Sequence, residues 1–232
     1  MKDIIVVILA GGKGTRLKEK TKIIPKPMVK VFNKPILVHI INHYKKYGIK
    51  KFIIATGFKS KVVEEYFKNK KDISVIYTGL NTLTGGRLKR LEKYINNTFF
   101  LTYGDGICDI NINSLYKFHK KHKKIATITG VHPVARFGEI ILNKNGVVKN
   151  FNEKPQVKND WINGGFFVFE KNIFKYLRND KEVLEKYPLQ KLTRMKELIA
   201  FRYEGFWHCM DTIRDIEIVN KILRHKWLKK RS

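Results

Sequence analysis

An apolar run that ends in a glycine-rich turn lies at the start of the chain and constrains the fold more than any other feature. Residues 4–9 are continuously apolar and mostly β-branched, which is typical of a strand buried on both faces. Gly11, Gly12 and Gly14 follow at once, and Arg16 adds a positive charge. Glycines let backbone N–H groups approach an anion closely, and the helix that we expect after the turn adds the positive end of its dipole. The segment therefore predicts a phosphate-binding turn at the carboxyl edge of a parallel sheet.

Two well-known phosphate-binding loops do not match this turn. A Walker A loop needs a Gly-Lys-Ser or Gly-Lys-Thr ending, which is absent. A dinucleotide-binding turn needs a third glycine where Leu17 stands, and an acidic residue near Lys34 to hold a ribose hydroxyl. The turn therefore binds phosphate in another way, unless it is a tight strand–helix turn with an incidental arginine.

The composition indicates a globular protein with one sizeable core. The chain has 232 residues, of which 43% are hydrophobic, so we expect a single domain over residues 1–232. The first apolar run is too short to span a membrane and lacks a cleavage site, which predicts a cytoplasmic protein without a membrane partner. Cys108 and Cys209 have no partners at metal-ligand spacing, so we expect free thiols.

The charge of the chain favours two other classes of protein. A formal net charge of +28 would by itself indicate binding to nucleic acid or to a membrane surface. The lysines, however, are spread over nearly every segment, and no known nucleic-acid-binding module accompanies them. We therefore expect solvated surface charge and no nucleic-acid partner, and a basic nucleic-acid-binding module remains the non-enzymatic alternative.

Hydrophobic periodicity predicts alternating strands and helices in the first half of the chain. Strands are expected over residues 4–9, 51–57, 73–77, 97–103 and 125–131, and helices between Pro35 and Gly48, after a Ser60 cap, and over residues 112–124. This βαβαβ order predicts a parallel, doubly wound sheet.

The second half of the chain follows a different pattern. Residues 138–142 and 147–152 flank an Asn-Lys-Asn-Gly turn and predict a hairpin, which we expect in an acceptor-binding lobe over about residues 133–170. Residues 172–198 are expected to be mostly helical and residues 199–204 to form a strand. A helix from Thr212 to Lys230 is expected to close the chain, in the segment 212–232.

Two basic motifs could contact further phosphate groups. Pro25 and Pro27 are expected to hold the backbone extended around Lys26, which would aim this lysine, although an exposed charge in a proline-rich turn is the alternative. Gly85 and Gly86 open onto a basic helix start after the third strand, again where a ligand would meet a strand edge. A solvated helix cap is the alternative there.

Two acids and a glycine pair complete the candidate site. Asp105 lies between glycines at the end of an apolar strand, and Asp211 precedes the last helix. Mg²⁺ prefers carboxylate oxygens, so we predict that these two acids hold it together, although positions in a sequence cannot show that they meet and an ordinary turn aspartate is the alternative. Gly164 and Gly165 begin an aromatic strand and predict close approach of a sugar, or else a bulge.

In their order and spacing, these motifs resemble the sugar-1-phosphate nucleotidyltransferases and, more narrowly, the glucose-1-phosphate cytidylyltransferases among them. The resemblance runs from residue 2 to about residue 214. It rests on residues 9–16, 25–28, 84–90, 102–106, 153–155, 163–167, 205–207 and 210–212.

This resemblance implies a Rossmann-like fold of the GT-A type, with a mixed, mostly parallel central sheet flanked by helices and a small β-hairpin acceptor lobe. It also implies a reaction: CTP and a sugar 1-phosphate, most closely α-D-glucose 1-phosphate, would give a CDP-sugar and pyrophosphate by in-line attack on the α-phosphorus, with Mg²⁺ as cofactor. We further expect a homo-oligomer. One departure is the short segment 73–83, which is longer in the family's cytidylyltransferases.

The resemblance assigns roles to individual residues. The nucleotide would be bound by Leu9, Ala10, Gly11, Gly12, Lys13, Gly14, Thr15, Arg16, Lys26, Thr82, Thr84, Arg87 and Gly104. The sugar phosphate would be bound by Glu153, Lys154, Asn163, Gly164, Gly165 and Trp207, and Mg²⁺ by Asp105 and Asp211. Arg16, Lys26 and Lys154 would be the catalytic residues.

Two enzymatic alternatives remain open. The first keeps the reaction and changes the substrates, to UTP, dTTP or GTP as donor or to another phosphorylated acceptor. The second is a glycosyltransferase with a related sheet; it usually carries an Asp-x-Asp pair, whereas Gly106 and Ile107 follow Asp105 here.

Overall fold

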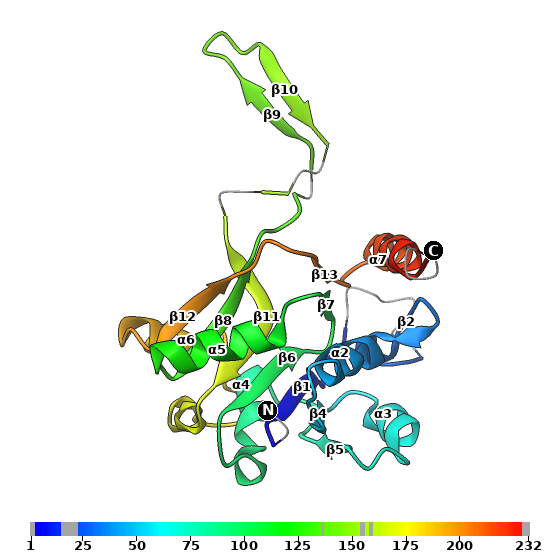
Figure 1. Cartoon of the computed structure of the whole chain (residues 1–232), viewed down its shortest axis with the longest axis vertical. Coiled ribbons are helices and arrows are strands. Elements are labelled where there is room, and N and C mark those ends of the chain that lie inside the picture. The colour runs from blue at the N-terminus through cyan, green and yellow to red at the C-terminus, as the bar shows by residue number, and fades with distance from the viewer. Residues whose placement is uncertain (1–2, 15–22, 136, 154–155, 158–159, 229–232) are drawn as a thin grey trace.

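A computed structural model describes residues 3–14, 23–135, 137–153, 156–157 and 160–228 of the chain, and the side chains as far as residue 224. Seven strands form one twisted sheet in the order β12-β8-β11-β6-β1-β4-β5 (Figure 1). In sequence they are β1 (Ile5–Ala10), β4 (Lys51–Thr56), β5 (Ile73–Tyr77), β6 (Phe99–Tyr103), β8 (Ala126–Val131), β11 (Ile162–Phe169) and β12 (Leu198–Arg202). Only β11 runs antiparallel to its neighbours, β6 and β8. The prediction of a mixed, mostly parallel sheet is confirmed.

The position of β1 between two layers of helices explains why its sequence is continuously apolar. Val6 and Ile8 pack into one hydrophobic cluster, with residues from the helices α2 (Ile36–Lys45), α3 (Ser60–Phe67), α5 (Ile112–His122) and α7 (Ile213–Leu228). Val7 and Leu9 point to the other face, into a second cluster with residues from α4, α6 and η4. Because successive side chains of a strand point to opposite faces, a strand covered by helices on both faces has no polar position.

The helices flank the sheet. Their bounds are α2 (Ile36–Lys45), α3 (Ser60–Phe67), α4 (Thr84–Lys89), α5 (Ile112–His122), α6 (Tyr187–Arg194) and α7 (Ile213–Leu228). Three 3₁₀ turns, η2 (Lys26–Met28), η3 (Glu92–Tyr94) and η4 (Lys171–Tyr176), complete the helical elements of the described residues. None of these helices is long and apolar enough to cross a membrane.

Three short ribbons lie outside the main sheet. Strand β2 (Lys30–Val31) pairs with β3 (Lys34–Pro35), and β7 (Gly106–Cys108) pairs with β13 (Trp207–Cys209). The predicted hairpin forms from β9 (Glu139–Leu142) and β10 (Val148–Asn152) and projects away from the sheet (Figure 1).

The projecting hairpin carries apolar side chains on one face. Ile140 pairs with Phe151 and Leu142 pairs with Val148, so the four side chains share that face. Each of them is about half exposed or more, up to 62% for Phe151. This face packs against no other part of the described chain that would bury it.

Several local predictions need correction. Ser60 is the first residue of α3 and not its cap, which is Lys59 in a left-handed conformation. The segment 172–198 is helical only in η4 and α6, because turns occupy the residues between them. The backbone around Lys26 is not extended, since Lys26 begins the 3₁₀ turn η2 after an extended Pro25. The helix expected after Gly14 starts outside the described residues.

His119 of α5 is a buried polar group within the fold, with only 1% of its surface exposed. Its Nδ1 lies 2.8 Å from Thr127 Oγ1, and its Nε2 lies 3.2 Å from Glu170 Oε1. Burial lowers the pKa of His119 to about 4, against the opposing attraction of Glu170. An unfolded histidine has a pKa of about 6.5. Between these two values the unfolded chain binds more protons, so the free energy of unfolding falls as the pH is lowered.

We therefore expect acidification from pH 7 to pH 5 to cost the native protein about 1–2 kcal/mol more in unfolding free energy than it costs the His119→Gln variant. Glutamine keeps a hydrogen-bonding side chain but does not titrate. Urea unfolding of both proteins at the two pH values measures the difference. Equal losses in the two proteins would show that His119 does not contribute to the acid sensitivity.

Candidate active site

A cavity of about 460 Å³ opens at the carboxyl ends of β1 and β6. Its lining includes ten of the predicted nucleotide-binding residues: Leu9, Ala10, Gly11, Gly12, Gly14, Lys26, Thr82, Thr84, Arg87 and Gly104. Asp105 and Asp211, the predicted metal ligands, line the same cavity. Lys13 is exposed and lies outside its lining, whereas Thr15, Arg16 and Lys154 fall outside the described residues.

Lys26 lies between the two predicted metal ligands. Its Nζ donates to Asp105 Oδ2 at 2.5 Å and to Asp211 Oδ1 at 2.7 Å. Only 8% of Lys26 is exposed, and burial alone would lower its pKa, but the charge of Asp105 and the hydrogen bonds to both carboxylates outweigh burial and raise it. The ammonium group therefore stays charged and occupies a position that suits a cation.

Backbone interactions on either side hold the two acids together. Asp105 follows β6 and directly precedes β7, and Asp211 lies two residues beyond Cys209, the last residue of β13. The pairing of β7 with β13 places Cys209 opposite Gly106, and the N–H of Met210 donates to the carbonyl of Asp105 at 2.9 Å. The structure thus brings together two acids that are 106 residues apart, which their positions in the sequence could not show.

The start of α7 fixes the backbone of Asp211. Asp215 Oδ2 accepts from the N–H of Asp211 at 3.0 Å and from the N–H of Thr212 at 2.6 Å. Thr212 Oγ1 in turn accepts from the N–H of Asp215 at 3.2 Å. This reciprocal arrangement is a capping box, which satisfies helix N–H groups that have no partner within the helix.

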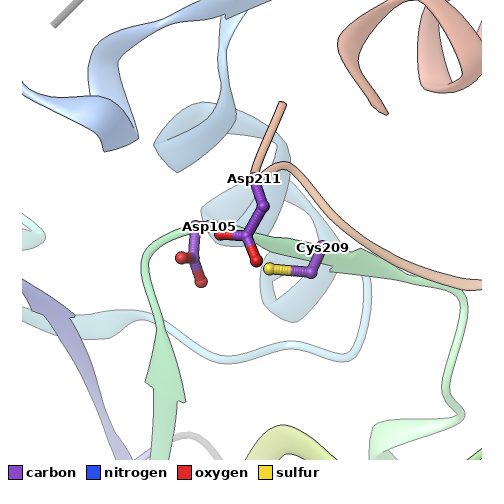
Figure 2. A group of neighbouring side chains, drawn as sticks. All are labelled: Asp105, Cys209 and Asp211. Atoms are coloured by element: carbon purple, nitrogen blue, oxygen red, sulfur yellow. The ribbon is translucent and has the colours of Figure 1, made fainter. Parts of the chain in front are cut away.

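Cys209 is the third side chain near the two acids that is of a type able to bind a metal ion. Its sulfur and one carboxylate oxygen each from Asp105 and Asp211 all lie within 4.8 Å of one another (Figure 2). Both cysteines are free thiols, as expected, although their spacing in the sequence did not show that Cys209 lies beside two carboxylates. Burial, with a further contribution from the charge of Asp105, raises the pKa of this thiol well above its usual range.

Arg87 supports the glycine-rich turn from within the protein. Only 4% of Arg87 is exposed, and its guanidinium donates to the carbonyls of Gly11, Thr56 and Gly79 and to Thr78 Oγ1, at 2.7–3.0 Å. A Cβ atom on Gly11 would lie 2.2 Å from this guanidinium. Arg87 therefore fixes the shape of the turn and requires glycine at position 11, and a direct contact with nucleotide stays a prediction.

Four of the six predicted sugar-phosphate-binding residues, Asn163, Gly164, Gly165 and Trp207, lie close together beside Tyr103 of the cavity lining. Trp207 Nε1 donates to the carbonyl of Gly164 at 2.7 Å, and Asn163 Nδ2 donates to Tyr103 Oη at 3.1 Å. Gly165 has φ of +74°, and a Cβ there would lie 2.5 Å from the Tyr103 ring. The pairing of β11 with β8 shifts register between Asn163 and Phe167, so this glycine pair marks an irregularity as well as a close approach. Glu153 is exposed, just beyond the end of the hairpin.

Four residues of the cavity lining were missed by the sequence analysis: Pro27, Leu83, Tyr103 and Glu185. Tyr103 Oη donates to Glu185 Oε1, and Thr84 Oγ1 donates to Glu185 Oε2 at 2.6 Å. Burial and the neighbouring charge of Glu185 raise the pKa of Tyr103 well above its usual range. The position of Tyr103 directly before Gly104 was an available signal, whereas Glu185 lies in a segment that resembled an ordinary helix.

Comparison with known proteins agrees with this geometry. A family model described as nucleotidyl transferase matches residues 5–222. The chain belongs to this nucleotidyl transferase family and is an enzyme. The predicted GT-A-type nucleotidyltransferase fold is confirmed as well, because the solved structure of a putative glucose-1-phosphate thymidylyltransferase from Bacillus anthracis superposes on 95% of the chain with a TM-score of 0.78.

Two relatives and one solved structure show how far the similarity extends. A glucose-1-phosphate cytidylyltransferase of Salmonella typhimurium is 42% identical, over 90% of this chain and 91% of the relative. A probable glucose-1-phosphate cytidylyltransferase of Bacillus subtilis is 38% identical, over 93% and 94%. The crystal structure of HddC from Yersinia pseudotuberculosis complexed with GMP-PN is 25% identical, covers 95% of this chain and 99% of that one, and has a TM-score of 0.75.

We expect Gly11→Ala and Arg87→Met each to lower the free energy of unfolding by about 2–4 kcal/mol, because either change leaves buried carbonyls without the guanidinium. The double variant should lose less than the sum of the two by at least about 1 kcal/mol, since both changes disrupt the same interaction.

Gly12→Ala is the matched control for this experiment. A Cβ on Gly12 meets no atom within 4 Å, so its effect should stay within about 0.5 kcal/mol. Denaturant unfolding of the four variants measures these values. Additive losses in the double variant would show that Arg87 and the turn do not depend on each other.

Proposed function

We propose that this enzyme transfers the cytidylyl group of CTP to α-D-glucose 1-phosphate and releases pyrophosphate. The observation that carries the proposal is the cluster of Asp105, Asp211 and Lys26 in a cavity that also contains the glycine-rich turn. The cluster offers one positively charged group for the phosphates of a substrate and two negatively charged groups for the cation that accompanies them. The choice of CTP and glucose 1-phosphate is supported by the names of the Salmonella and Bacillus relatives, which align over nine-tenths of the chain.

The attacking oxygen in this reaction needs no general base. A phosphate monoester has a second pKa near 6, so the sugar 1-phosphate is already ionised at neutral pH. The obstacle is the repulsion between two polyanions, and catalysis should therefore rest on positioning and on neutralisation of charge. Lys26 supplies one fixed positive charge, and we propose that Arg16 and Lys154 supply two more.

Asp105 and Asp211 fit a divalent cation. Both carboxylates already share a positive group, the ammonium of Lys26, and hard cations such as Mg²⁺ prefer carboxylate oxygens. We propose that these two acids hold Mg²⁺, which when bound would neutralise charge on the triphosphate and polarise the phosphoryl group. The capping box at Asp215 and the pairing of β7 with β13 keep the two carboxylates in place.

The other predicted contacts follow the two sides of the cavity. We propose that the glycine-rich turn with Thr82 and Thr84 binds the nucleotide. Asn163, Gly164, Gly165 and Trp207, with Glu153 and Lys154, would bind the sugar phosphate. Tyr103 and Glu185 lie between the two groups, because they connect Asn163 to Thr84 through hydrogen bonds.

A second candidate keeps the reaction and changes the donor. The HddC structure, which superposes on nearly the whole chain, contains GMP-PN. That structure supports GTP as donor, together with a different sugar 1-phosphate. The same site would carry out either reaction, because the phosphates and not the base react.

We also propose that the enzyme is cytoplasmic and forms a homo-oligomer, with no nucleic-acid or membrane partner. The exposed apolar face of the β9–β10 hairpin supports self-association, because an isolated two-stranded hairpin is marginally stable in water.

Ile140→Lys combined with Phe151→Lys should lower the mass measured by light scattering after size-exclusion chromatography. An unchanged mass, or a monomeric parent protein, would contradict this role of the hairpin.

Pyrophosphate release tests the substrates. We expect release with Mg²⁺, CTP and α-D-glucose 1-phosphate that depends on the acceptor and exceeds release with UTP, dTTP, ATP or GTP. Release with another pair of substrates would keep the reaction and overturn the choice of CTP or glucose 1-phosphate. No release with any pair of nucleoside triphosphate and sugar 1-phosphate would contradict the proposal.

We expect Asp105→Asn and Asp211→Asn each to reduce turnover at least about a hundredfold, about 2.7 kcal/mol in the barrier, with the fold intact by circular dichroism. Asp72→Asn is the control, because Asp72 precedes β5 at the opposite edge of the sheet and pairs with Lys45. Activity within about tenfold of the parent in either active-site variant would contradict the metal assignment.

A further inference from the structure

Cys209 belongs to the group of side chains that surrounds the proposed metal position. Its sulfur and the carboxylate oxygens of Asp105 and Asp211 point toward a common space (Figure 2). Ligands of one tetrahedral zinc ion lie about 2.0–2.3 Å from the metal, so two of them are about 3.3–3.6 Å apart. The observed mutual separations, all within 4.8 Å, are compatible with this spacing once side-chain rotations draw the three donor atoms together around the metal.

The backbone determines this arrangement. Cys209 ends β13 and lies two residues before Asp211. The register of β7 against β13 places Cys209 opposite Gly106, the residue after Asp105. The sulfur is therefore held near both carboxylates by strand pairing.

The three donors together suit a different class of cation from the carboxylates alone. Mg²⁺ takes oxygen ligands, keeps several waters and does not favour sulfur. Zn²⁺ and Co²⁺ accept thiolate, carboxylate and water in one coordination shell, and a site with three protein ligands leaves a position open. A sulfur beside a pair of carboxylates thus discriminates between these cations.

We propose that Asp105, Cys209 and Asp211 form a binding site for thiophilic divalent cations of the Zn²⁺ type, with Cys209 as a direct ligand. Binding replaces the thiol proton by the metal and releases that proton to solvent. The proposal rests on the proposed function only in that both place a cation at Asp105 and Asp211. Its consequence is that the cation selectivity of this position depends on Cys209.

Lys26 opposes the binding of any cation at this position. Its Nζ hydrogen-bonds to both carboxylates, so an incoming cation must displace the ammonium or bind beside it against electrostatic repulsion. We therefore expect Lys26→Met to bind Zn²⁺ more tightly than the parent protein. A helper role for Lys26 in metal binding would predict the opposite sign.

Titration of the protein with Co²⁺, without CTP or sugar phosphate, tests the proposal directly. Thiolate ligation gives an intense near-ultraviolet sulfur-to-cobalt charge-transfer band. We expect this band in the parent protein, at one equivalent of Co²⁺ per chain, and its displacement by Zn²⁺. Cys209→Ser should lose the band, because a hydroxyl keeps the size of the side chain and removes the sulfur.

Cys108→Ala is the matched control. Cys108 is buried in β7 and is not part of the group with Asp105 and Asp211, so its variant should keep the band. Zn²⁺ affinity, measured by competition with a chromophoric chelator, should fall at least about tenfold in Cys209→Ser, and the affinity for Mg²⁺ should fall less. No band in the parent, a band retained in Cys209→Ser, or a band lost in Cys108→Ala would each overturn the proposal.

This experiment separates the two proposals. A cobalt band that depends on Cys209, together with no pyrophosphate release from any pair of substrates, would support the metal site and refute the proposed reaction. Pyrophosphate release from CTP and glucose 1-phosphate, together with no band in the parent protein, would support the reaction and refute Cys209 as a ligand.

Discussion

Two carboxylates held around one ammonium group are the interaction on which the rest of this structure depends. Asp105 and Asp211 would repel each other without Lys26, whose Nζ lies within 2.7 Å of an oxygen of each. Removal of one partner from such a partly buried group would leave the remaining charge without compensation. The arrangement therefore needs a rigid backbone on each side, and the chain supplies it from three distant segments.

Each of these segments uses a different physical device. The 3₁₀ turn at Lys26 is preceded by Pro25 and contains Pro27, both of which restrict the backbone. Asp105 stands where β6 ends and β7 begins, and Asp211 is fixed by the capping box of α7. Arg87 completes the support from the other side, because it donates to the carbonyl of Gly11 in the glycine-rich turn of the same cavity. The cavity is thus assembled by strand ends, a helix cap and one buried guanidinium.

Much of this could be predicted from the sequence, because the decisive patterns are local. The apolar run at β1 has no polar position, and it proved to be covered on both faces. The turn Asn-Lys-Asn-Gly located the β9–β10 hairpin, and Asp105 between two glycines marked a strand end that lines the cavity. Each of these signals requires only a few consecutive residues, which is why a single sequence contains them.

The remaining features depend on contacts between distant residues. The ribbon of β7 with β13 joins two strands of three residues each, too short for a periodic pattern. Glu185 enters the cavity because Tyr103 and Thr84, far away in the sequence, offer it hydrogen bonds. The sequence shows no partner of Cys209 at metal-ligand spacing, whereas its neighbours in the structure are two carboxylates. The only sequence signal for this arrangement is that Cys209 lies two residues before Asp211.

We propose that Asp105 and Asp211 act together as one cation site. Electron paramagnetic resonance of Mn²⁺ added to the enzyme together with CTP tests this proposal, because free and bound Mn²⁺ give different signals. We expect one bound Mn²⁺ per chain in the parent and in Asp72→Asn, and binding weakened at least about tenfold in Asp105→Asn and Asp211→Asn alike. Equal Mn²⁺ binding in the parent and in either active-site variant would contradict it.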